Sequence, residues 1–268
     1  MTKKVISYIA LILLGLCFLI PFVIMVLGSF KEMRYALLGP LFDFSSSLSL
    51  NNYLYIFKDG IFLRWIWNTV VITIIPVLSQ MLFCAILGYI FAKKQFKGRE
   101  VTFWIFMAVI MIPQQLLIIP KYIMFAKFSW INTYWSLIVP EIWGIMGVFL
   151  IRQFLQSIPN DFEEAARIDG ANDLKIFFKV ILPLSIPVVA TVGTFSFISN
   201  WNDLFQPLIY MTQEQMYTIS VGLASMLGKE GNFGIEMAGS ALSFIPTFLI
   251  FLFFQRYFTE GIQMSGLK

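Results

Sequence analysis

Histidine is absent from this 268-residue sequence, and cysteine is almost absent. Imidazole is the commonest metal ligand and the usual acid–base group near neutral pH. The two cysteines, Cys17 and Cys84, lie inside separate apolar runs, where we interpret them as small hydrophobic residues and not as a disulfide or a metal pair. These absences argue against a metalloenzyme, and we expect no catalytic residue and no metal site in the chain.

Charged residues are also scarce. They make up 13% of the sequence, against 59% hydrophobic residues, whereas soluble domains contain roughly a quarter charged residues. Because this small number of polar side chains cannot cover a surface that faces water, the sequence predicts a protein surrounded by lipid. The 29 phenylalanines and seven tryptophans fit lipid contact and anchoring at the membrane interface. The net charge of +4 gives no support for nucleic-acid binding.

Several apolar runs are long enough to cross a membrane as helices, which takes about 20 residues for about 30 Å of hydrocarbon. The sequence therefore predicts an all-α membrane protein with six transmembrane helices. The first is expected to be retained, because its apolar run is too long for the core of a signal peptide. We divide the chain into a first span with an external loop (1–64), a core with five spans (65–258) and a tail (259–268). The predicted spans cover residues 5–30, 65–92, 102–122, 133–154, 184–211 and 237–258.

Lysine and arginine are distributed unequally between the two sides of the membrane that these spans define. Twelve fall on the side of the termini and seven on the other side. Cytoplasmic loops of membrane proteins carry an excess of these residues, and the basic loop at 93–99 contributes most to the difference. The distribution predicts cytoplasmic termini and a cytoplasmic tail. It also predicts external loops at 31–64, with a short helix at 50–57, and at 212–236, where glycines suggest flexibility.

The densest cluster of charge lies at residues 160–187, on the predicted cytoplasmic side. Asn160 is expected to cap a helix, with Glu163 in the capping-box position three residues later. Gly170 is expected to end that helix in the left-handed conformation. A second helix at 174–182 follows, capped by Asn172 or Asp173 and ended by Pro183.

Small and aromatic side chains share one face of the first of these helices. Phe162, Ala166 and Gly170 are four residues apart and therefore lie above one another. Small residues on this face would let another surface approach closely. From these features alone, an ordinary capped helix within a loop explains the stretch as well as a docking site for a soluble partner does.

The spacing of this stretch matches a known pattern, EAA-x3-G-x9-I-x-LP. Glu164-Ala165-Ala166 is followed after three residues by Gly170 and after nine more by residues 180–183, and only Val180 departs from the pattern, in place of isoleucine. The stretch thus resembles the EAA loop of binding-protein-dependent ABC-importer permeases. Roughly residues 65–261 are similar to the MalG-type subunits of carbohydrate importers, with further matches at 92–99, 111–113, 131–134, 201–203 and 254–261.

The resemblance implies a type I ABC importer permease fold in the cytoplasmic membrane of a bacterium. The EAA stretch at 160–183 would form the coupling helix that docks on a separate ATPase. ATP and Mg²⁺ would be bound by that ATPase and not by this chain, which has no Walker A sequence. The implied partners are a MalF-type permease subunit, two ABC ATPase subunits, an extracellular solute-binding protein, membrane lipid and a sugar substrate. The implied coupling residues are Phe162, Glu164, Ala165, Ala166, Asp169 and Gly170.

Polar residues inside the predicted spans are candidates for the substrate pathway, because buried polar groups are costly in a membrane. Trp201 with its polar neighbours has the aromatic and amide chemistry that holds sugars. The alternative is that these groups pair with other helices; we favour it for Glu141 and leave both interpretations open for residues 200–203. The predicted pathway residues are Asn200, Trp201, Asn202, Asp203 and Gln114, and Asn68, Thr69 and Gln115 are weaker candidates.

These patterns favour a permease subunit that moves a sugar or oligosaccharide by alternating access, driven by ATP through the EAA loop. An ion-coupled secondary transporter is the alternative, and it would require ionisable groups in mid-membrane and an internal repeat. Glu141 and Asp203 are the only acidic candidates for such groups, and no repeat is evident. An integral membrane enzyme is the weakest interpretation, because the chain lacks histidine and a pair of carboxylates suited to catalysis.

Overall fold

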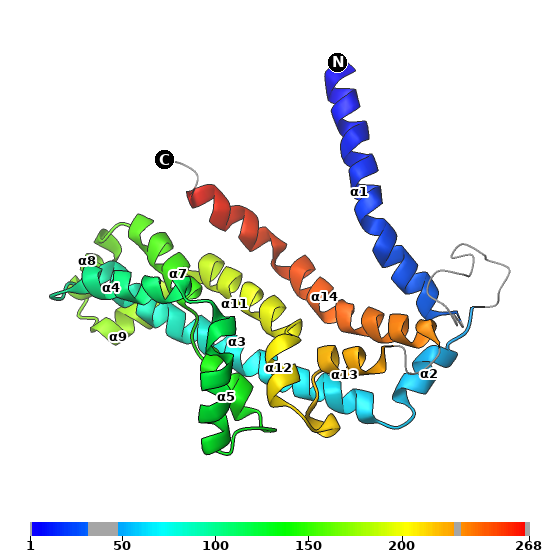
Figure 1. Cartoon of the computed structure of the whole chain (residues 1–268). Helices are drawn as coiled ribbons and strands as arrows, with labels where there is room; N and C mark the ends of the chain where they lie inside the picture. The colour runs from blue at the N-terminus through cyan, green and yellow to red at the C-terminus, as the bar shows by residue number, and fades with distance from the viewer. Residues whose placement is uncertain (1, 32–47, 228–231, 266–268) are drawn as a thin grey trace. The chain divides into compact units, whose positions relative to one another are not determined.

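We describe a computed structural model of the chain over residues 2–31, 48–227 and 232–265 (Figure 1). Within these ranges the chain is built from helices, and no strand occurs in them. It divides into two compact units: one is formed by residues 1–66 and 218–246, the other by residues 67–217 and 247–268. Parts of both predicted external loops and the end of the predicted tail fall outside the described residues.

The first unit contains α1 (Thr2–Ser29) and α2 (Asn51–Phe57), close to the predicted first span and short helix. Asn52 joins the segments of this unit, since its amide nitrogen donates to the backbone oxygens of Ser29 and Lys31 at 2.9 and 2.8 Å. The side-chain amide of Asn232 donates to the Asn52 oxygen at 3.0 Å. These bonds satisfy backbone groups at the end of α1.

The predicted loop at 212–236 contains a helix, so the expectation of a flexible glycine-bearing loop is wrong for part of it. Helix α13 (Ile219–Met226) is capped by Thr218, whose hydroxyl accepts a hydrogen bond from the Val221 amide at 3.3 Å. Gly222 lies against Trp65, where an added Cβ would be 2.1 Å from the indole ring. This glycine therefore serves close packing and not flexibility.

The second unit holds most of α3 (Ile61–Lys93) and a sharply bent third segment. Helix α4 (Arg99–Ala108) continues as η1 (Val109–Met111), and η2 (Gln114–Leu117) leads into α5 (Ile118–Lys127). The two halves meet at 84°, so the third segment is broken between Met111 and Gln114. The break follows from Pro113, because Ile112 before it takes the extended conformation, with φ −83° and ψ 112°.

The fourth segment runs through α6 (Trp135–Ile138), η3 (Val139–Glu141) and α7 (Ile145–Ser157), in agreement with the predicted span. Helix α8 (Asp161–Ile168) and helix α9 (Asp173–Ile176) follow. The chain then passes through a π-helical turn, η4 (Phe177–Ile181), into α10 (Leu182–Leu184). The predicted second helix of this stretch thus continues past Pro183, which occupies a position at the start of α10, where a proline is tolerated.

The predicted fifth span is wrong at its second half. Helix α11 (Ile186–Trp201) ends ten residues before the predicted boundary at 211, and α12 (Phe205–Tyr210) is a separate short helix. Asp203 separates the two helices by accepting hydrogen bonds from the amides of Phe205 and Gln206 at 2.9 and 3.4 Å. The segments before and after Ser185 also meet at 76°.

Helix α14 (Phe233–Ser265) is the last segment and extends into the predicted tail, so residues 259–265 are helical. Four helices of the described chain are long and apolar enough to cross a membrane, and the number rises to six if each bent pair forms one span. The prediction of six spans agrees with the upper value.

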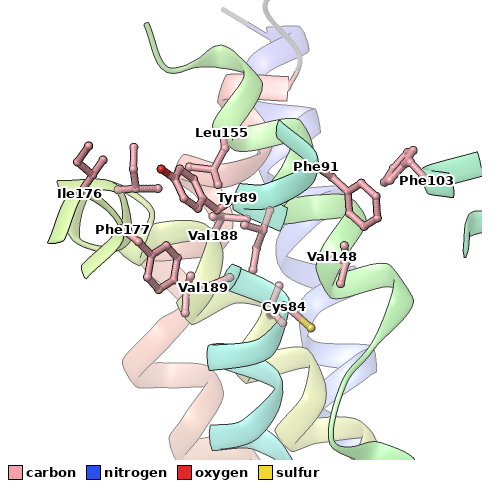
Figure 2. Packing of buried hydrophobic residues seen from close by; sticks show 14 residues of the cluster. Cys84, Tyr89, Phe91, Phe103, Val148, Leu155, Ile176, Phe177, Val188 and Val189 are labelled. Carbon is pink, nitrogen blue, oxygen red and sulfur yellow. The ribbon is translucent and has the colours of Figure 1, made fainter. Parts of the chain in front are cut away.

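The main hydrophobic core of the second unit packs α3 against α7 and α11 (Figure 2). Cys84 is fully buried there as a small apolar residue, as predicted, whereas Cys17 is exposed. Gly88 allows α3 and α7 to approach closely, because an added Cβ would be 2.6 Å from the Ile151 side chain. Small residues at helix contacts are the usual means of close packing between membrane helices. This core carries the helices that position α8.

Candidate functional site

Helix α8 and the turn after it have the backbone that the sequence predicts. Gly170 has φ +78°, which is the left-handed conformation that glycine adopts without strain. Its amide donates to the Arg167 oxygen at 3.0 Å, and the Ala171 amide donates to the Ala166 oxygen at 2.9 Å. These bonds satisfy carbonyl groups at the end of α8 and turn the chain toward α9.

The predicted capping box at the start of α8 is not formed. Asn160 has helical backbone angles and its side chain makes no capping hydrogen bond; its Oδ1 accepts from Lys93 Nζ at 2.8 Å. The side chain of Glu163 turns toward α3 and so does not reach back to the Asn160 amide. The second predicted cap is correct, since Asn172 Oδ1 accepts a hydrogen bond from the Lys175 amide at 2.9 Å.

Glu163 is the one buried residue of α8, with 7% of its surface exposed. Tyr89 of α3 donates its phenolic hydrogen to Glu163 Oε2 at 3.3 Å. The ammonium group of Lys94 lies 3.6 Å from the same oxygen. Glu163 Oε1 is also buried and has no hydrogen-bond partner among the described residues. A single carboxylate thus connects α8 to the last turns of α3.

Lys94 extends this connection to the helix after the turn. Its ammonium group donates to Asp173 Oδ1 at 2.9 Å, and Arg167 donates to the same oxygen at 2.7 Å. The ammonium also lies 4.7 Å from the centre of the Tyr89 ring. Burial by itself would lower the pKa of Lys94, but hydrogen bonds with Tyr89 and Asp173 outweigh it and raise the pKa. Lys94 is therefore charged at neutral pH.

Apart from Glu163 and Ala166, the residues of α8 are exposed. Phe162 is 48% exposed and Ile168 is 86% exposed. The only predicted coupling residue that turns inward is Ala166, which is half-buried against the main core. It lies three residues after Glu163, on the same side of the helix. The other predicted coupling residues, Glu164, Ala165, Asp169 and Gly170, are exposed with Phe162.

Two features of this region were missed by sequence reasoning. Ile168 was not chosen, although a large apolar residue between Arg167 and Asp169 is a signal for contact with a partner. Arg152 is one of the twelve basic residues on the side of the termini, and no pairing is predicted for it, yet it is 5% exposed and its Nη2 donates to both carboxylate oxygens of Glu100 at 2.9 and 2.7 Å. This pair ties α7 to α4 beside the end of α3.

The predicted pathway residue Trp201 lies in the core, which is a correction to the idea that it contacts sugar. Its side chain is 3% exposed, and its ring stacks on Phe197 with centroids 5.4 Å apart. Asn200 donates to the Ser196 backbone oxygen one turn earlier at 2.8 Å. Asn202 remains exposed, although its amide donates to the Ile198 oxygen at 2.8 Å.

Glu141 and two glutamines from other segments lie together in the second unit. Gln206 of α12 donates to Glu141 Oε1 at 3.5 Å, and Gln80 of α3 donates to the Glu141 backbone oxygen at 2.9 Å. Pairing with other helices, the interpretation favoured for Glu141, is therefore correct. The predicted pathway residue Gln114 is exposed and accepts from Lys121 at 2.8 Å.

Asn68 also has a structural role. Its amide donates to the backbone oxygens of Gln215 and Tyr217 at 2.9 Å each, and its oxygen accepts from the Tyr134 hydroxyl at 2.8 Å. All its main hydrogen-bonding groups are thus used within the protein. Of the predicted pathway residues, Asn202 and Gln114 present exposed side chains, and Asp203 is half-buried at the start of α12.

Comparisons with known proteins identify one family model and several related permease proteins. Residues 84–264 match the family model described as "Binding-protein-dependent transport system inner membrane component". The chain is 36% identical over 253 residues to the arabinooligosaccharides transport system permease protein AraQ of Halalkalibacterium halodurans, covering 92% of this chain and 90% of that protein. It is 30% identical to the trehalose/maltose transport system permease protein MalG of Thermococcus litoralis, covering 99% and 97%.

The fold is also similar to that of a solved structure. One chain in the crystal structure of a bacterial ABC transporter involved in the import of the acidic polysaccharide alginate superposes with a TM-score of 0.85. The match covers 95% of this chain and 96% of that chain at 24% sequence identity. At this identity the similarity concerns the fold.

Proposed function

The chain belongs to the family of binding-protein-dependent transport system inner membrane components and is a carbohydrate ABC transport permease; on this premise we propose that α8 couples it to a separate ATPase. The observation that carries the proposal is the surface of α8. An eight-residue helix with acidic residues in its first turn also exposes Phe162 and Ile168. Exposed apolar side chains next to charged ones are typical of a surface that docks on another protein.

The occupant of that surface is proposed to be an ABC ATPase subunit. Glu164 would make polar contacts with it, and Ala165 beside Glu164 would allow close approach. Phe162 and Ile168 would supply apolar contact, and Asp169 and Gly170 would form the edge of the docked surface. Ala166 is assigned to packing within this chain, because it already faces the core.

Coupling would work through rigid movement and needs no covalent chemistry in this chain. Closure of two ATPase subunits on ATP and Mg²⁺, both bound by the partners, would draw the docked helices together. Because α8 is attached to α3 through Glu163, its displacement would be passed to the spans. The spans would then alternate between inward-facing and outward-facing states, with a MalF-type permease as the other half of the pathway.

The proposed setting is a bacterial cytoplasmic membrane, with six spans and cytoplasmic termini. Six spans follow if each bent pair crosses as one unit. The excess of lysine and arginine, twelve against seven, supports the proposal that α8 lies on the cytoplasmic side. An extracellular solute-binding protein would deliver substrate on the opposite side.

The proposed cargo is an oligosaccharide. This choice is supported by the relatives, one named for arabinooligosaccharides and another for trehalose and maltose. Asn202, Asp203 and Gln114 are the proposed contacts within this chain, because amides and carboxylates bind sugar hydroxyls. Trp201 is left out of the pathway because it is buried.

Substitution Glu164→Lys tests the coupling proposal. It reverses the charge of an exposed residue of α8 and is expected to abolish uptake and to weaken association with the ATPase. The protein should still insert into the membrane at the wild-type level, because the substituted side chain makes no contribution to the core. Uptake of an arabinooligosaccharide and co-purification of the ATPase are the measurements. Normal uptake by this variant would contradict the proposal.

A further inference from the structure

We infer that Glu163 is a positioning residue, which with Tyr89 and Lys94 fixes α8 to the end of α3 so that movement of α8 reaches the spans. The inference rests on the proposed coupling function and assigns a second, distinct role within the same helix. Glu164 would meet the ATPase on the outside, and Glu163 would transmit the movement on the inside. The two neighbouring carboxylates thus have separate tasks.

The geometry separates the two glutamates clearly. Successive residues of a helix point about 100° apart, so neighbours face different surroundings. Glu163 is 7% exposed and contacts α3, whereas Glu164 is exposed. Of all residues in α8, Glu163 alone is buried. Besides it, only the half-buried Ala166 of α8 is turned toward the main core, so apolar packing supplies little of the attachment.

Stability alone does not account for a carboxylate at this position. Glu163 Oε1 is buried and has no hydrogen-bond partner among the described residues, which carries a desolvation cost. An apolar side chain of similar volume often replaces such a buried charge without loss of stability. The carboxylate is better explained by the directed bond from Tyr89 and the charge of Lys94, which fix the position of α8 on α3.

Two neighbouring lysines, Lys93 and Lys94, attach both ends of the hairpin formed by α8 and α9. Lys94 joins Glu163 before the turn to Asp173 after it, with distances of 3.6 and 2.9 Å. Lys93 donates to the Ile158 backbone oxygen and to Asn160 just before α8. Figure 2 shows Tyr89 within the core beside Phe177, whose ring centroid is 5.5 Å away. Because the hairpin is attached on both sides of Gly170, a displacement of α8 would move α3 and would not only bend the turn at Gly170.

The test compares Glu163→Gln with the wild type in the assembled complex, reconstituted with the ATPase and a solute-binding protein in liposomes. The amide keeps the shape of the side chain and removes its charge. We expect the ATPase to co-purify normally, while the amount of arabinooligosaccharide probe moved per ATP falls about tenfold, the size expected for one charge-assisted hydrogen bond. Asp161→Asn is the matched control, because Asp161 is exposed in the same first turn, and its ratio should stay at the wild-type value.

A double-mutant cycle separates transmission from simple stability. Tyr89→Phe removes only the hydroxyl group and should also lower the amount of probe moved per ATP. The double variant Tyr89→Phe/Glu163→Gln should be little worse than either single variant, since each single variant already weakens the same attachment of α8 to α3. A wild-type ratio in Glu163→Gln would overturn the inference. The inference would also be overturned if the amount of probe moved per ATP fell only in proportion to thermal stability. In that case it would return to the wild-type value when only assembled complex is counted.

The outcomes also distinguish this inference from the proposed function. Glu164→Gln should reduce co-purification of the ATPase, whereas Glu163→Gln should not. If the wild-type chain fails to bind any ATPase, the proposed function is wrong and the inference falls with it. If the wild-type chain binds the ATPase, Glu164→Gln weakens that binding and Glu163→Gln behaves like the wild type, the proposed function stands. The inference alone is then wrong.

Discussion

Gly88 shows how one side chain controls the contact between two helices. It faces Ile151 of α7, and an added Cβ would lie 2.6 Å from the Ile151 Cγ2 atom and 3.2 Å from the Arg152 backbone nitrogen. The Ile151 side chain is fully buried in the main core and has little space in which to move. Arg152, on the same turn, is held by Glu100. Any displacement of α7 therefore also disturbs this ion pair.

We predict that Gly88→Ala lowers the free energy of unfolding by about 1–3 kcal/mol, the usual cost of overpacking a core. Gly15→Ala in α1 is the control, because nothing lies within 4 Å of its added Cβ. The control should be neutral or slightly stabilising, since alanine favours helices over glycine. Thermal unfolding of the purified protein in detergent measures both variants, and equal melting temperatures for the two would contradict the prediction.

Trp201 illustrates a limit of reading function from residue type. Tryptophan between asparagines and an aspartate has the composition of a sugar site, and the same composition fits a helix end next to a core. The choice depends on the direction of the indole ring, which stacks on Phe197. The ring lies in a buried cluster with Val77, and Ile250 packs against that cluster; both residues are far away from Trp201 in the sequence.

At the scale of the element, the turn between α8 and α9 depends on the left-handed conformation of Gly170. An added Cβ at this position would meet no atom within 4 Å, so the cost of a substitution is backbone strain and not a clash. The turn sets the direction of α9 and so the place of Asp173, which binds both Lys94 and Arg167. A change of backbone here would loosen the hairpin on α3.

Gly170→Ala is predicted to cost about 1–2 kcal/mol of stability, the strain of an L-residue in the left-handed region, and to reduce uptake. Gly60→Ala provides the matched control. Gly60 also has φ +69° with nothing within 4 Å of an added Cβ, and it lies outside α8. It should lose a similar amount of stability while uptake per folded molecule stays normal. Equal uptake by both variants, after correction for the folded amount, would show that the turn has no special role.

The broken segments show which features of an element are predictable. Pro113 marks the break in the third segment, because proline restricts the residue before it. The angle of 84° between α4 and α5 depends on packing of both halves and has no sequence signal. The end of α11 at Trp201 is not predicted for a similar reason: the apolar run continues past it, and the hydrogen bonds from the Phe205 and Gln206 amides to Asp203, which begin α12, have no sequence signal.

At the scale of the whole molecule, membership of the ABC permease family predicts that ATP and not an ion gradient drives uptake. The two candidate acidic groups support this expectation. Asp203 accepts hydrogen bonds from two backbone amides, and Glu141 accepts one from Gln206. Both are therefore engaged in local structure, which does not favour a role as a mobile proton carrier.

Addition of a protonophore to cells that keep their ATP is predicted to leave uptake running. The expected change is small, because in the proposed function hydrolysis by the partner subunits would supply the free energy. Uptake of labelled arabinooligosaccharide is measured together with cellular ATP, and depletion of ATP without a protonophore is the control that should stop it. Immediate collapse of uptake at constant ATP would favour an ion-coupled transporter.

The sequence by itself determined the class of the protein and the location of α8. Long apolar runs specify membrane helices because each residue contributes its own transfer free energy. Gly170 and Asn172 specify a turn and a cap because these depend on neighbouring residues only. The spacing of Glu164 to Pro183 identified the family for the same reason.

Only the tertiary structure decided which surface each residue of α8 faces. Glu163 and Glu164 are chemically identical neighbours, and one is buried under Tyr89 and Lys94 while the other is exposed. Their surroundings are set by α3, where Tyr89 lies 74 residues before Glu163 in the chain. Packing between distant segments is cooperative and leaves no local pattern. For that reason α8 could be located from the sequence, whereas its attachment to α3 could not.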